Sequence, residues 1–356
     1  MNSRSSGPDS QSPRVAAESR RETKVAAEGR RETRVAAEER RETKVALKVD
    51  CDTLEGTREG VPRLLEILAA RGIRATFYFT FGPDRSGVAA LRVFTRKGFL
   101  PKMLRSRAAS LYGWRTMLSG TLLPAPSIAG GASDAMRAAA DAGHDTGVHG
   151  WDHVGWHDRL DRMAAERVAD EYGRAHAEYL RIFGVPARTS AAPGWTVSAR
   201  SLEVQEERSL RHVSDTRLGP PFFPSAGGRV FSTLEIPTTL PTLDETLAWP
   251  ELVGDEAQRR FFRGAVRGTE VHTIHAEVEG RSKAALFASI LDDWIAAGVS
   301  FPRLSELAEE AVARRDRIPV REVVKTRLPG RGGTVATGWP EEAAASASAR
   351  TGRSTS

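Results

Sequence analysis

The stretch Lys48-Val49-Asp50-Cys51-Asp52-Thr53 decides how the rest of this 356-residue chain is interpreted. It continues the apolar run Val45-Ala46-Leu47, and the two together predict a β-strand. Side chains two residues apart on a strand point to the same face, so the carboxylates of Asp50 and Asp52 should lie side by side. Two such carboxylates repel each other, and a metal ion or a shared proton would stabilise the pair. We therefore expect a metal-binding or proton-transfer site at the end of this strand.

The composition allows a sizeable core and excludes an intramolecular disulfide. Hydrophobic residues make up 40% of the chain, and Cys51 is its single cysteine. The N-terminus is polar and charged, without the apolar core of a signal peptide. No run of 18 uninterrupted apolar residues offers a transmembrane helix. We expect a protein that is soluble or bound at a membrane surface.

The net charge of +6 comes from the two ends of the chain. Residues 1–44 hold 11 basic and 8 acidic side chains, and residues 314–356 hold 9 and 4. Residues 45–313 keep 32 basic and 34 acidic side chains, a net charge of −2. The basic character of the whole chain therefore gives little support to nucleic-acid binding, and we expect no nucleic-acid partner.

Both ends are expected to be disordered tails around one domain that spans residues 45–313. Residues 14–44 contain a charged decapeptide repeat, whose only large apolar side chains are Val15, Val25 and Val35. A step of ten residues turns a helix by about 80° from one valine to the next, so the valines form no continuous stripe. Residues 314–356 are rich in Arg, Gly, Ala and Ser, a composition typical of disorder.

Strand-like and helix-like segments alternate between the two tails. Strands are predicted at 45–52, 75–79, 188–191, 212–215, 230–236 and 270–275, with one more ending at His149; helices are predicted near 57–71, 133–142, 158–183, 198–208, 255–267, 283–297 and from Ser305. This alternation predicts an α/β fold with a parallel, barrel-like sheet. In such folds the active site lies at the carboxyl ends of the strands. The residues that fall there are Asp50, Asp52, His149, Asp215 and His275.

Residues 85–133 interrupt this pattern with a different composition. The 49 residues between Asp84 and Asp134 include eight basic side chains and no acidic one. A basic, aromatic and amphipathic segment fits an anionic membrane surface or an anionic lipid substrate, although an ordinary helical insertion would also be amphipathic. The side chains expected to contact the membrane or the lipid are Arg96, Lys97, Phe99, Leu100, Lys102, Met103, Leu104, Arg105, Tyr112 and Trp114.

Histidines supply the further ligands that a metal at the first motif would need. In His149-Gly150-Trp151-Asp152-His153, the two histidines would share one face of a helical turn. Together with Asp52 they make a set of two histidines and one carboxylate, which leaves positions open for water and substrate. This set suits Zn, Co, Mn, Fe or Ni without choosing among them. Without an acid partner, two unrelated surface histidines would be the preferred interpretation.

A third motif, Thr273-Ile274-His275-Ala276-Glu277, ends the last strand predicted in the barrel. A histidine at the end of an apolar strand is more often structural than catalytic. This strand, however, is expected to end at the same edge of the sheet as the first motif, so His275 joins the candidate site.

Together these motifs resemble the polysaccharide deacetylase (NodB-homology) family. The resemblance rests on VDCDT, HGWDH, the turn APGW from Ala192, Ser214-Asp215 and the final IHAE. Longer runs are similar to the ArnD subgroup, the 4-deoxy-4-formamido-L-arabinose-phosphoundecaprenol deformylases. These runs are GTREGVPRLL, MLRS with ASLYGW, IPTTLPT and TIHAEVEG. The similarity extends from about residue 45 to 308 and excludes both tails.

The resemblance implies a distorted parallel (β/α) barrel and one divalent metal ion. It implies that Asp50 is the general base and His275 the general acid. It assigns the metal to Asp52, His149 and His153. The implied substrate is a formamido sugar linked to undecaprenyl phosphate, whose deformylation serves lipid A modification and resistance to cationic antimicrobial peptides.

One departure from the family concerns the residue that holds the general base. The family places an arginine ahead of the proline of its third motif to orient the base, but two alanines stand there in this chain. Either another residue holds Asp50, for which Arg217 is the candidate with Asp215 in a supporting role, or no residue does. The run Asp215-Thr216-Arg217-Leu218-Gly219 also departs from the subgroup, because it carries an additional residue between Arg217 and Gly219. The turn Pro193-Gly194-Trp195 should lie beside the substrate and supply a backbone N–H to the oxyanion.

Two other functions fit parts of this pattern. An N-acetyl-sugar deacetylase acting on peptidoglycan or another glycan would share the chemistry, but the absent signal peptide and the 85–133 segment favour a lipid-linked substrate. A membrane-bound metalloprotein without catalysis would not need the complete acid–base set. We expect a peripheral protein on the cytoplasmic face of the inner membrane, with no transmembrane helix. The sequence leaves its oligomeric state open.

Overall fold

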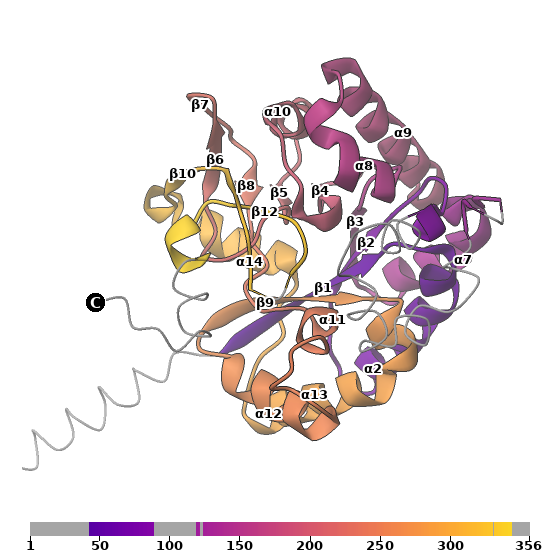
Figure 1. The fold of residues 1–356 in the computed structure, drawn as a ribbon, viewed down its shortest axis with the longest axis vertical. Helices are drawn as coiled ribbons and strands as arrows, with labels where there is room; N and C mark the ends of the chain where they lie inside the picture. The colour runs from indigo at the N-terminus through magenta and orange to yellow at the C-terminus, as the bar shows by residue number, and fades with distance from the viewer. Residues whose placement is uncertain (1–42, 89–118, 122–123, 330, 344–356) are drawn as a thin grey trace, which may run out of the picture. The chain divides into compact units, whose positions relative to one another are not determined.

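A parallel sheet of seven strands organises the fold. The computed structural model describes residues 43–88, 119–121, 124–329 and 331–343. The strands stand in the order β8-β5-β4-β3-β2-β1-β9, with parallel pairing throughout, and Figure 1 shows β1 and β9 side by side. They are β1 (Lys44–Cys51), β2 (Thr76–Phe79), β3 (Asp145–Val148), β4 (Thr189–Ser190), β5 (His212–Val213), β8 (Leu234–Glu235) and β9 (Thr269–His275).

The sheet curls until its two edges meet. The backbone amides of Thr239 and Leu240, which follow the edge strand β8, donate to the carbonyl oxygen of Val271 in β9 at 3.0 and 3.1 Å. The hydroxyl groups of Thr238 and Thr273 bond across the same seam at 2.7 Å. The predicted α/β fold with a distorted parallel barrel is therefore confirmed.

Helices follow the strands and share the largest hydrophobic core with them. That core takes Val45, Leu47 and Val49 from β1, whereas the alternate residues Lys48 and Asp50 are buried on the opposite face of the strand. The strand thus presents apolar side chains to the helices and its charged side chains to the barrel interior. The helices are α2 (Val61–Ala69), α7 (Ile128–Asp141), α8 (His153–Arg159), α9 (Ala165–Phe183), α10 (Ala199–Glu207), α11 (Leu243–Thr246), α12 (Asp255–Ala265), α13 (Ala284–Ala296) and α14 (Leu304–Val312).

The long helix predicted over 158–183 is two helices in the structure. A short 3₁₀ turn (Leu160–Arg162) follows α8, and Met163 and Ala164 then adopt extended backbone angles before α9 begins at Ala165. The break separates the short helix α8, which begins at His153, from the long helix α9, which packs on the sheet. Periodicity alone did not show it, because both helices place apolar residues at similar spacing.

The disordered tail predicted over 314–356 is wrong for the residues described there. Strand β10 (Val320–Glu322) pairs with β6 (Phe223–Ala226), which also pairs with β7 (Arg229–Val230). Strands β11 (Val324–Thr326) and β12 (Val335–Thr337) form an antiparallel pair. The folded domain therefore continues from Lys44, which had been counted in the first tail, to Ala343.

Burial against the barrel explains why this C-terminal segment is ordered. Leu328, Val335 and Ala343 form an apolar cluster with Trp195, and the amide of Arg217 donates to the carbonyl oxygen of Ala336 at 2.9 Å. These contacts join parts of the chain more than 100 residues apart, so the local composition did not reveal them.

Parts of two predictions lie outside the described residues. They are the repeat over 14–42 and the membrane-facing residues between Arg96 and Trp114. Among the described residues, no helix has the length and the apolar character needed to cross a bilayer.

Candidate active site

The structure brings the predicted chemical residues to one edge of the sheet. Asp50 lies near the end of β1, directly beside His275 at the end of β9, and Asp52 follows one residue after β1. His149 comes immediately after β3. These positions follow from parallel pairing, because the carboxyl ends of all the strands meet at the same edge.

Asp52, His149 and His153 form a compact set of three possible metal ligands. One ligand atom from each lies within 4.8 Å of the other two. The Nε2 atom of His149 is 3.2 Å from Oδ1 of Asp52, and Nε2 of His153 is 3.4 Å from Oδ2. Burial alone would raise the pKa of Asp52, but the two imidazoles hold it well below its usual value, so this carboxylate is an anion.

The surroundings fit this set to a divalent metal. Nδ1 of His149 lies 2.9 Å from the carbonyl oxygen of Ala191, which fixes the tautomer that leaves Nε2 facing Asp52. Oδ1 of Asp52 is buried and accepts no hydrogen bond among the described residues. A buried carboxylate oxygen without a donor is costly unless a cation neutralises it, and a metal ion would do so.

The prediction that both histidines lie on one helical turn is wrong in detail. The chain turns at Gly150 with a φ of +106°, a value that favours glycine. Asp152 then caps α8, accepting a hydrogen bond from the amide of Gly155 at 2.9 Å. The rings of His149 and His153 still approach each other, with centroids 5.2 Å apart, because the turn folds the loop back over the strand end.

Glu277 holds the metal-binding loop in place, a role that the sequence analysis missed. One of its carboxylate oxygens accepts hydrogen bonds from the amides of Asp52 and Thr53, at 2.9 and 2.8 Å, and from the hydroxyl group of Thr53 at 3.0 Å. The only signal in the sequence was its place two residues after His275. Glu277 thus ties the loop after β1 to the end of β9.

Lys48, and not Arg217, is the cation that holds Asp50. Its Nζ atom donates to Oδ2 of Asp50 at 3.0 Å, and both side chains are buried. Arg217 instead pairs with Glu245 at 2.9 Å, so the predicted contact with Asp50 is wrong. Lys48 occupies the position two residues before Asp50 and therefore the same face of β1, which was the signal available in the sequence.

Asp215 lies in the buried layer beneath this pair. Its carboxylate accepts a hydrogen bond from Gln205, and its amide donates to Glu235 at 2.9 Å. Burial raises the pKa of Asp215 to about 6, and the nearby charge of Lys48 partly offsets that rise. Among the described residues Asp215 makes no hydrogen bond or ion pair with Asp50 or His275, so its support of the base would act through the charge of Lys48.

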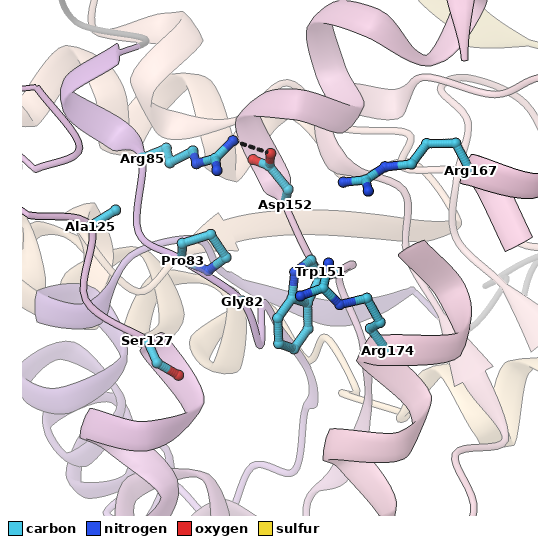
Figure 2. Close-up of a pocket in the computed structure, with 9 residues that line it drawn as sticks. All are labelled: Gly82, Pro83, Arg85, Ala125, Ser127, Trp151, Asp152, Arg167 and Arg174. Atoms are coloured by element: carbon cyan, nitrogen blue, oxygen red, sulfur yellow. Dashed lines mark hydrogen bonds and ion pairs between the residues drawn. The ribbon is translucent and has the colours of Figure 1, made fainter. Parts of the chain in front are cut away.

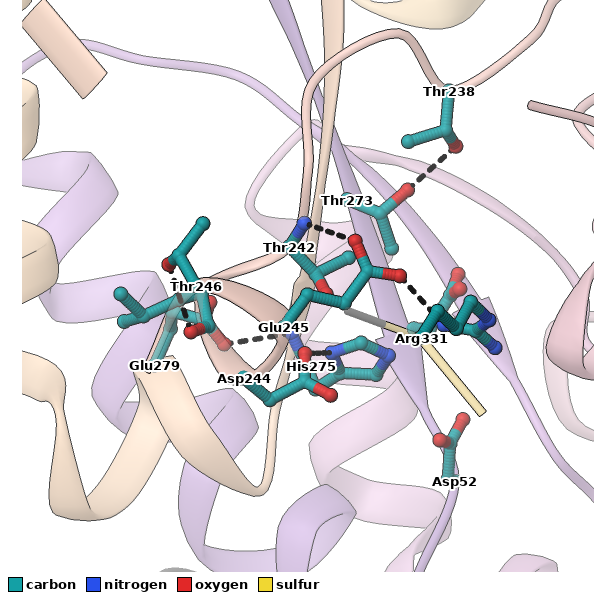
Figure 3. A network of polar contacts seen from close by, with 12 residues as sticks. Asp52, Thr238, Thr242, Asp244, Glu245, Thr246, Thr273, His275, Glu279 and Arg331 are labelled. Carbon is teal, nitrogen blue, oxygen red and sulfur yellow. Dashed lines mark hydrogen bonds and ion pairs between the residues drawn. The ribbon is translucent and has the colours of Figure 1, made fainter. Parts of the chain in front are cut away.

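His275 pairs with a carboxylate that the sequence analysis did not single out. Nδ1 of His275 is 3.4 Å from Oδ1 of Asp244, which lies on the short helix α11, and Figure 3 shows this pair within a larger polar network. Burial opposes charge on the imidazole, but Asp244 raises the pKa of His275 well above its ordinary value. The amide of His275 also donates to Glu279 at 2.8 Å. The raised pKa favours the protonated imidazolium, the form that a proton donor needs.

The turn Pro193–Trp195 is tight and partly strained. Gly194 and Trp195 have φ angles of +62° and +54°, and a Cβ atom on Gly194 would meet the ring of His157 at 2.1 Å. The amide of Trp195 already donates to the carbonyl oxygen of Ala192 at 3.1 Å. In this conformation it is not available to an oxyanion, and the donor predicted in this turn stays a prediction.

A separate cavity of about 320 Å³ adjoins the histidine turn at Trp151 and Asp152 (Figure 2). Arg85 donates to Asp152 at 2.8 Å, and the guanidinium group of Arg174 lies 4.4 Å from the centroid of the Trp151 ring. Asp152 is also the cap of α8, so these contacts fix the turn that presents His153.

Comparison with known proteins identifies the family. A protein of Shewanella sediminis (strain HAW-EB3) is 36% identical over 294 residues, which cover 81% of this chain and 92% of that protein. It carries the name 4-deoxy-4-formamido-L-arabinose-phosphoundecaprenol deformylase ArnD. The chain belongs to the ArnD family. A second protein of that name, from Wigglesworthia glossinidia brevipalpis, is 30% identical and covers 79% of this chain and 97% of its own length.

Two further comparisons agree with this assignment. The family model described as polysaccharide deacetylase matches residues 37–213. Solved structures share the fold, among them a protein from Mycobacterium smegmatis that carries the polysaccharide deacetylase name and has a TM-score of 0.54 at 18% identity, covering 81% of this chain and 96% of its own. The Puue allantoinase has a TM-score of 0.50 at 16% identity and covers 76% of this chain and 91% of its own.

Replacement of a predicted metal ligand by alanine tests the three-residue set. Asp52→Ala, His149→Ala and His153→Ala each remove one of the three donors, so each variant should lose its bound divalent metal after dialysis, measured by plasma mass spectrometry. His275→Ala is the matched control, because its imidazole is assigned to proton transfer and the variant should keep the metal content of the wild type. Full metal retention by all three ligand variants would refute the assignment.

A double-mutant cycle tests whether Lys48 holds Asp50. Lys48→Met leaves a buried carboxylate without its cation, which should lower the free energy of unfolding of the metal-free protein by about 3 kcal/mol. Adding Asp50→Asn removes that charge and should recover at least half of the loss, as measured by denaturant unfolding. If the two single effects simply add, the side chains do not interact as described.

Proposed function

We propose that this protein is a metal-dependent deformylase that hydrolyses the formamide of undecaprenyl-phosphate-linked 4-deoxy-4-formamido-L-arabinose. The observation that carries the proposal is the joint arrangement of an Asp/His/His set, a buried Asp–Lys pair and an Asp-paired histidine at one sheet edge. The names of the relatives in Shewanella and Wigglesworthia supply the substrate. The products would be formate and the 4-amino sugar lipid, which serves lipid A modification and resistance to cationic antimicrobial peptides.

The two aspartates divide the work between them. Asp52, His149 and His153 would hold a divalent ion, which when bound would supply Lewis-acid chemistry at the formyl oxygen and at a water molecule. Asp50 takes the proton from that water. Its Oδ1 atom accepts no hydrogen bond among the described residues, while Lys48 holds Oδ2, so one oxygen is fixed and the other can receive a proton.

His275 completes the reaction by protonating the departing amine. An amine is a poor leaving group until it gains a proton, so the C–N bond breaks as the imidazolium gives up its own. The charge of Asp244 stabilises the protonated form of His275 until the amine departs. His275 gives one proton to the amine and Asp50 holds the one taken from water, so the pair is restored when that proton returns to His275 through solvent. The cleavage itself yields formic acid and a neutral amine, and formic acid then loses its proton to solvent as formate.

An N-acetyl-sugar deacetylase is the second candidate, because the polysaccharide deacetylase model matches residues 37–213. The same residues would cleave an acetamide, so the substrate pocket and not the catalytic set separates the two functions. A metalloprotein without catalysis is the weakest candidate, since it would need neither the Asp50–Lys48 pair nor the His275–Asp244 pair.

A lipid-linked substrate also supports a place at the membrane. The protein would then be peripheral on the cytoplasmic face of the inner membrane, where an anionic surface would attract the basic residues at 85–133. One divalent ion, whether Zn, Co, Mn, Fe or Ni, would be the only cofactor.

Formate release decides between these functions. The purified full chain, loaded in turn with each candidate metal, should release formate from the formamido sugar lipid faster than acetate from the matching acetamido compound. Asp50→Asn should lower kcat at least about 100-fold without changing the metal content, because the general base is lost. Wild-type turnover by Asp50→Asn would exclude this base, and acetate release alone would favour the deacetylase.

The pH dependence of kcat tests the Asp244–His275 pair. His275 acts as an acid, so activity should be lost as pH rises through its pKa, which Asp244 raises. Asp244→Asn removes the charge that favours imidazolium and should move this basic limb to lower pH, leaving the acidic limb in place. Glu256→Gln, an exposed carboxylate change on α12, should leave both limbs unchanged. An unmoved basic limb in Asp244→Asn would assign that limb to another group.

A further inference from the structure

The C-terminal segment brings a cation, Arg331, to the wall of the active site. Its guanidinium group lies 4.5 Å from the centroid of the Trp195 ring, and that ring also has Arg217 at 4.6 Å and Lys48 at 5.2 Å. Lys48 is the residue that holds Asp50. Arg331 and the lysine that holds the proposed base therefore lie against the same indole ring. Arg331 belongs to the C-terminal segment that was predicted to be disordered.

The charges on this wall do not cancel. Glu245 accepts hydrogen bonds from Arg217 at 2.9 Å and from Arg331 at 2.8 Å, so two guanidinium groups share one carboxylate. Burial alone would raise the pKa of Glu245, but these two arginines lower it to about 2, which keeps it an anion. Lys48 is matched by Asp50, and His275 is matched by Asp244. The group of two arginines and Glu245 is left with one positive charge.

Of the two arginines, Arg331 is the one that solvent reaches in part. The side chain of Arg217 is 2% exposed, whereas that of Arg331 is 18% exposed. Arg331 uses one Nη1 donor on Glu245, and its Nε is buried without a partner among the described residues. Stacking on Trp195 and pairing with Glu245 fix the plane of the guanidinium group while leaving donors unused, which prepares it to bind an oxyanion.

Arg331 belongs to the same polar network as the partner of the proposed acid. Its charge acts on Asp244, whose pKa it helps to lower, and Asp244 is the partner of the proposed acid His275. Figure 3 shows the connection from Thr242 through Glu245 to Arg331 in one view with His275 and Asp52. In the proposed substrate the phosphodiester and the formamide are substituents of the same sugar ring, so an anion-binding side chain near His275 could hold one while the other reacts.

We propose that Arg331 binds a phosphate oxygen of the substrate and so selects sugars that carry a phosphodiester. The inference rests on the proposed deformylase function and names the group by which that site recognises its substrate. Arg331 takes no part in bond breaking. It holds the anionic end of the sugar, so that the formamide reaches the metal ligands and the base in the correct orientation.

A comparison of two substrates tests the role of Arg331. The first is the formamido sugar joined through a phosphodiester to a short prenyl chain, and the second is its uncharged methyl glycoside. Arg331→Ala should raise KM for the phosphodiester about 10- to 100-fold, the range expected for a lost hydrogen bond to a charged group. Its effect on kcat/KM should be at least about tenfold larger for the phosphodiester than for the methyl glycoside.

Two further variants separate charge recognition from structural damage. Arg331→Lys keeps the charge without the planar fork and should recover part of the lost affinity for the phosphodiester. Arg327→Ala removes an exposed arginine from the same segment and should leave both substrates unaffected. Thermal unfolding of each variant shows whether it is folded. Equal losses on the two substrates in folded Arg331→Ala would overturn the inference, because the arginine would then only support the wall.

The assays are run without membranes, so that a phospholipid headgroup cannot take the place of the substrate phosphate. A second series adds vesicles of phosphatidylglycerol. If Arg331→Ala differs from the wild type only in that series, Arg331 binds a membrane headgroup and the inference is wrong. Failure of the wild type to release formate from either compound would instead reject the proposed deformylase function.

Discussion

The arrangement of the active site depends on how two carboxylates can stand two residues apart at the end of one strand. Asp50 and Asp52 repel each other, and β1 buries Asp50 almost completely. The structure resolves the conflict by giving each carboxylate a different cation. Lys48 neutralises Asp50 from the same strand, whereas His149 and His153 with Asp52 make a place for a metal ion. The proposed division of labour between base and ligand rests on this separation.

The surrounding shell keeps that separation rigid. Glu277 gathers the amides of the loop after β1, and the carbonyl oxygen of Ala191 sets the tautomer of His149. Both contacts join the ends of neighbouring strands, β1 with β9 and β3 with β4, so the site depends on the pairing of these strands in register. The C-terminal segment packs beside them, where Trp195 contacts Leu328 and Val335 and Arg331 stacks on the Trp195 ring.

Much of the fold and of the candidate site could be predicted from the sequence, because it depends on the two-residue alternation along a strand and on parallel strand pairing. Strand alternation placed Asp50 and Asp52 on one face, and parallel pairing brought His275 beside them. The remainder depends on tertiary contacts without a local signature. Asp244 lies on a four-residue helix that no periodicity reveals. The segment with β11 and β12 is polar and rich in glycine, and its order depends on contacts with distant residues such as Trp195, Arg217 and Phe231. Lys48 lies on the same face of β1 as Asp50, but the family uses an arginine to orient the base, and the prediction therefore named Arg217.

A crystal structure of the metal-loaded protein, with the ion located by anomalous scattering, tests the central claim most directly. We expect one ion bound by Asp52, His149 and His153 at about 2.0–2.2 Å. Asp50 should stay outside this coordination shell and keep its hydrogen bond to Lys48. An ion that is bound by both aspartates, with Lys48 displaced, would contradict the division of the two carboxylates into a base and a ligand.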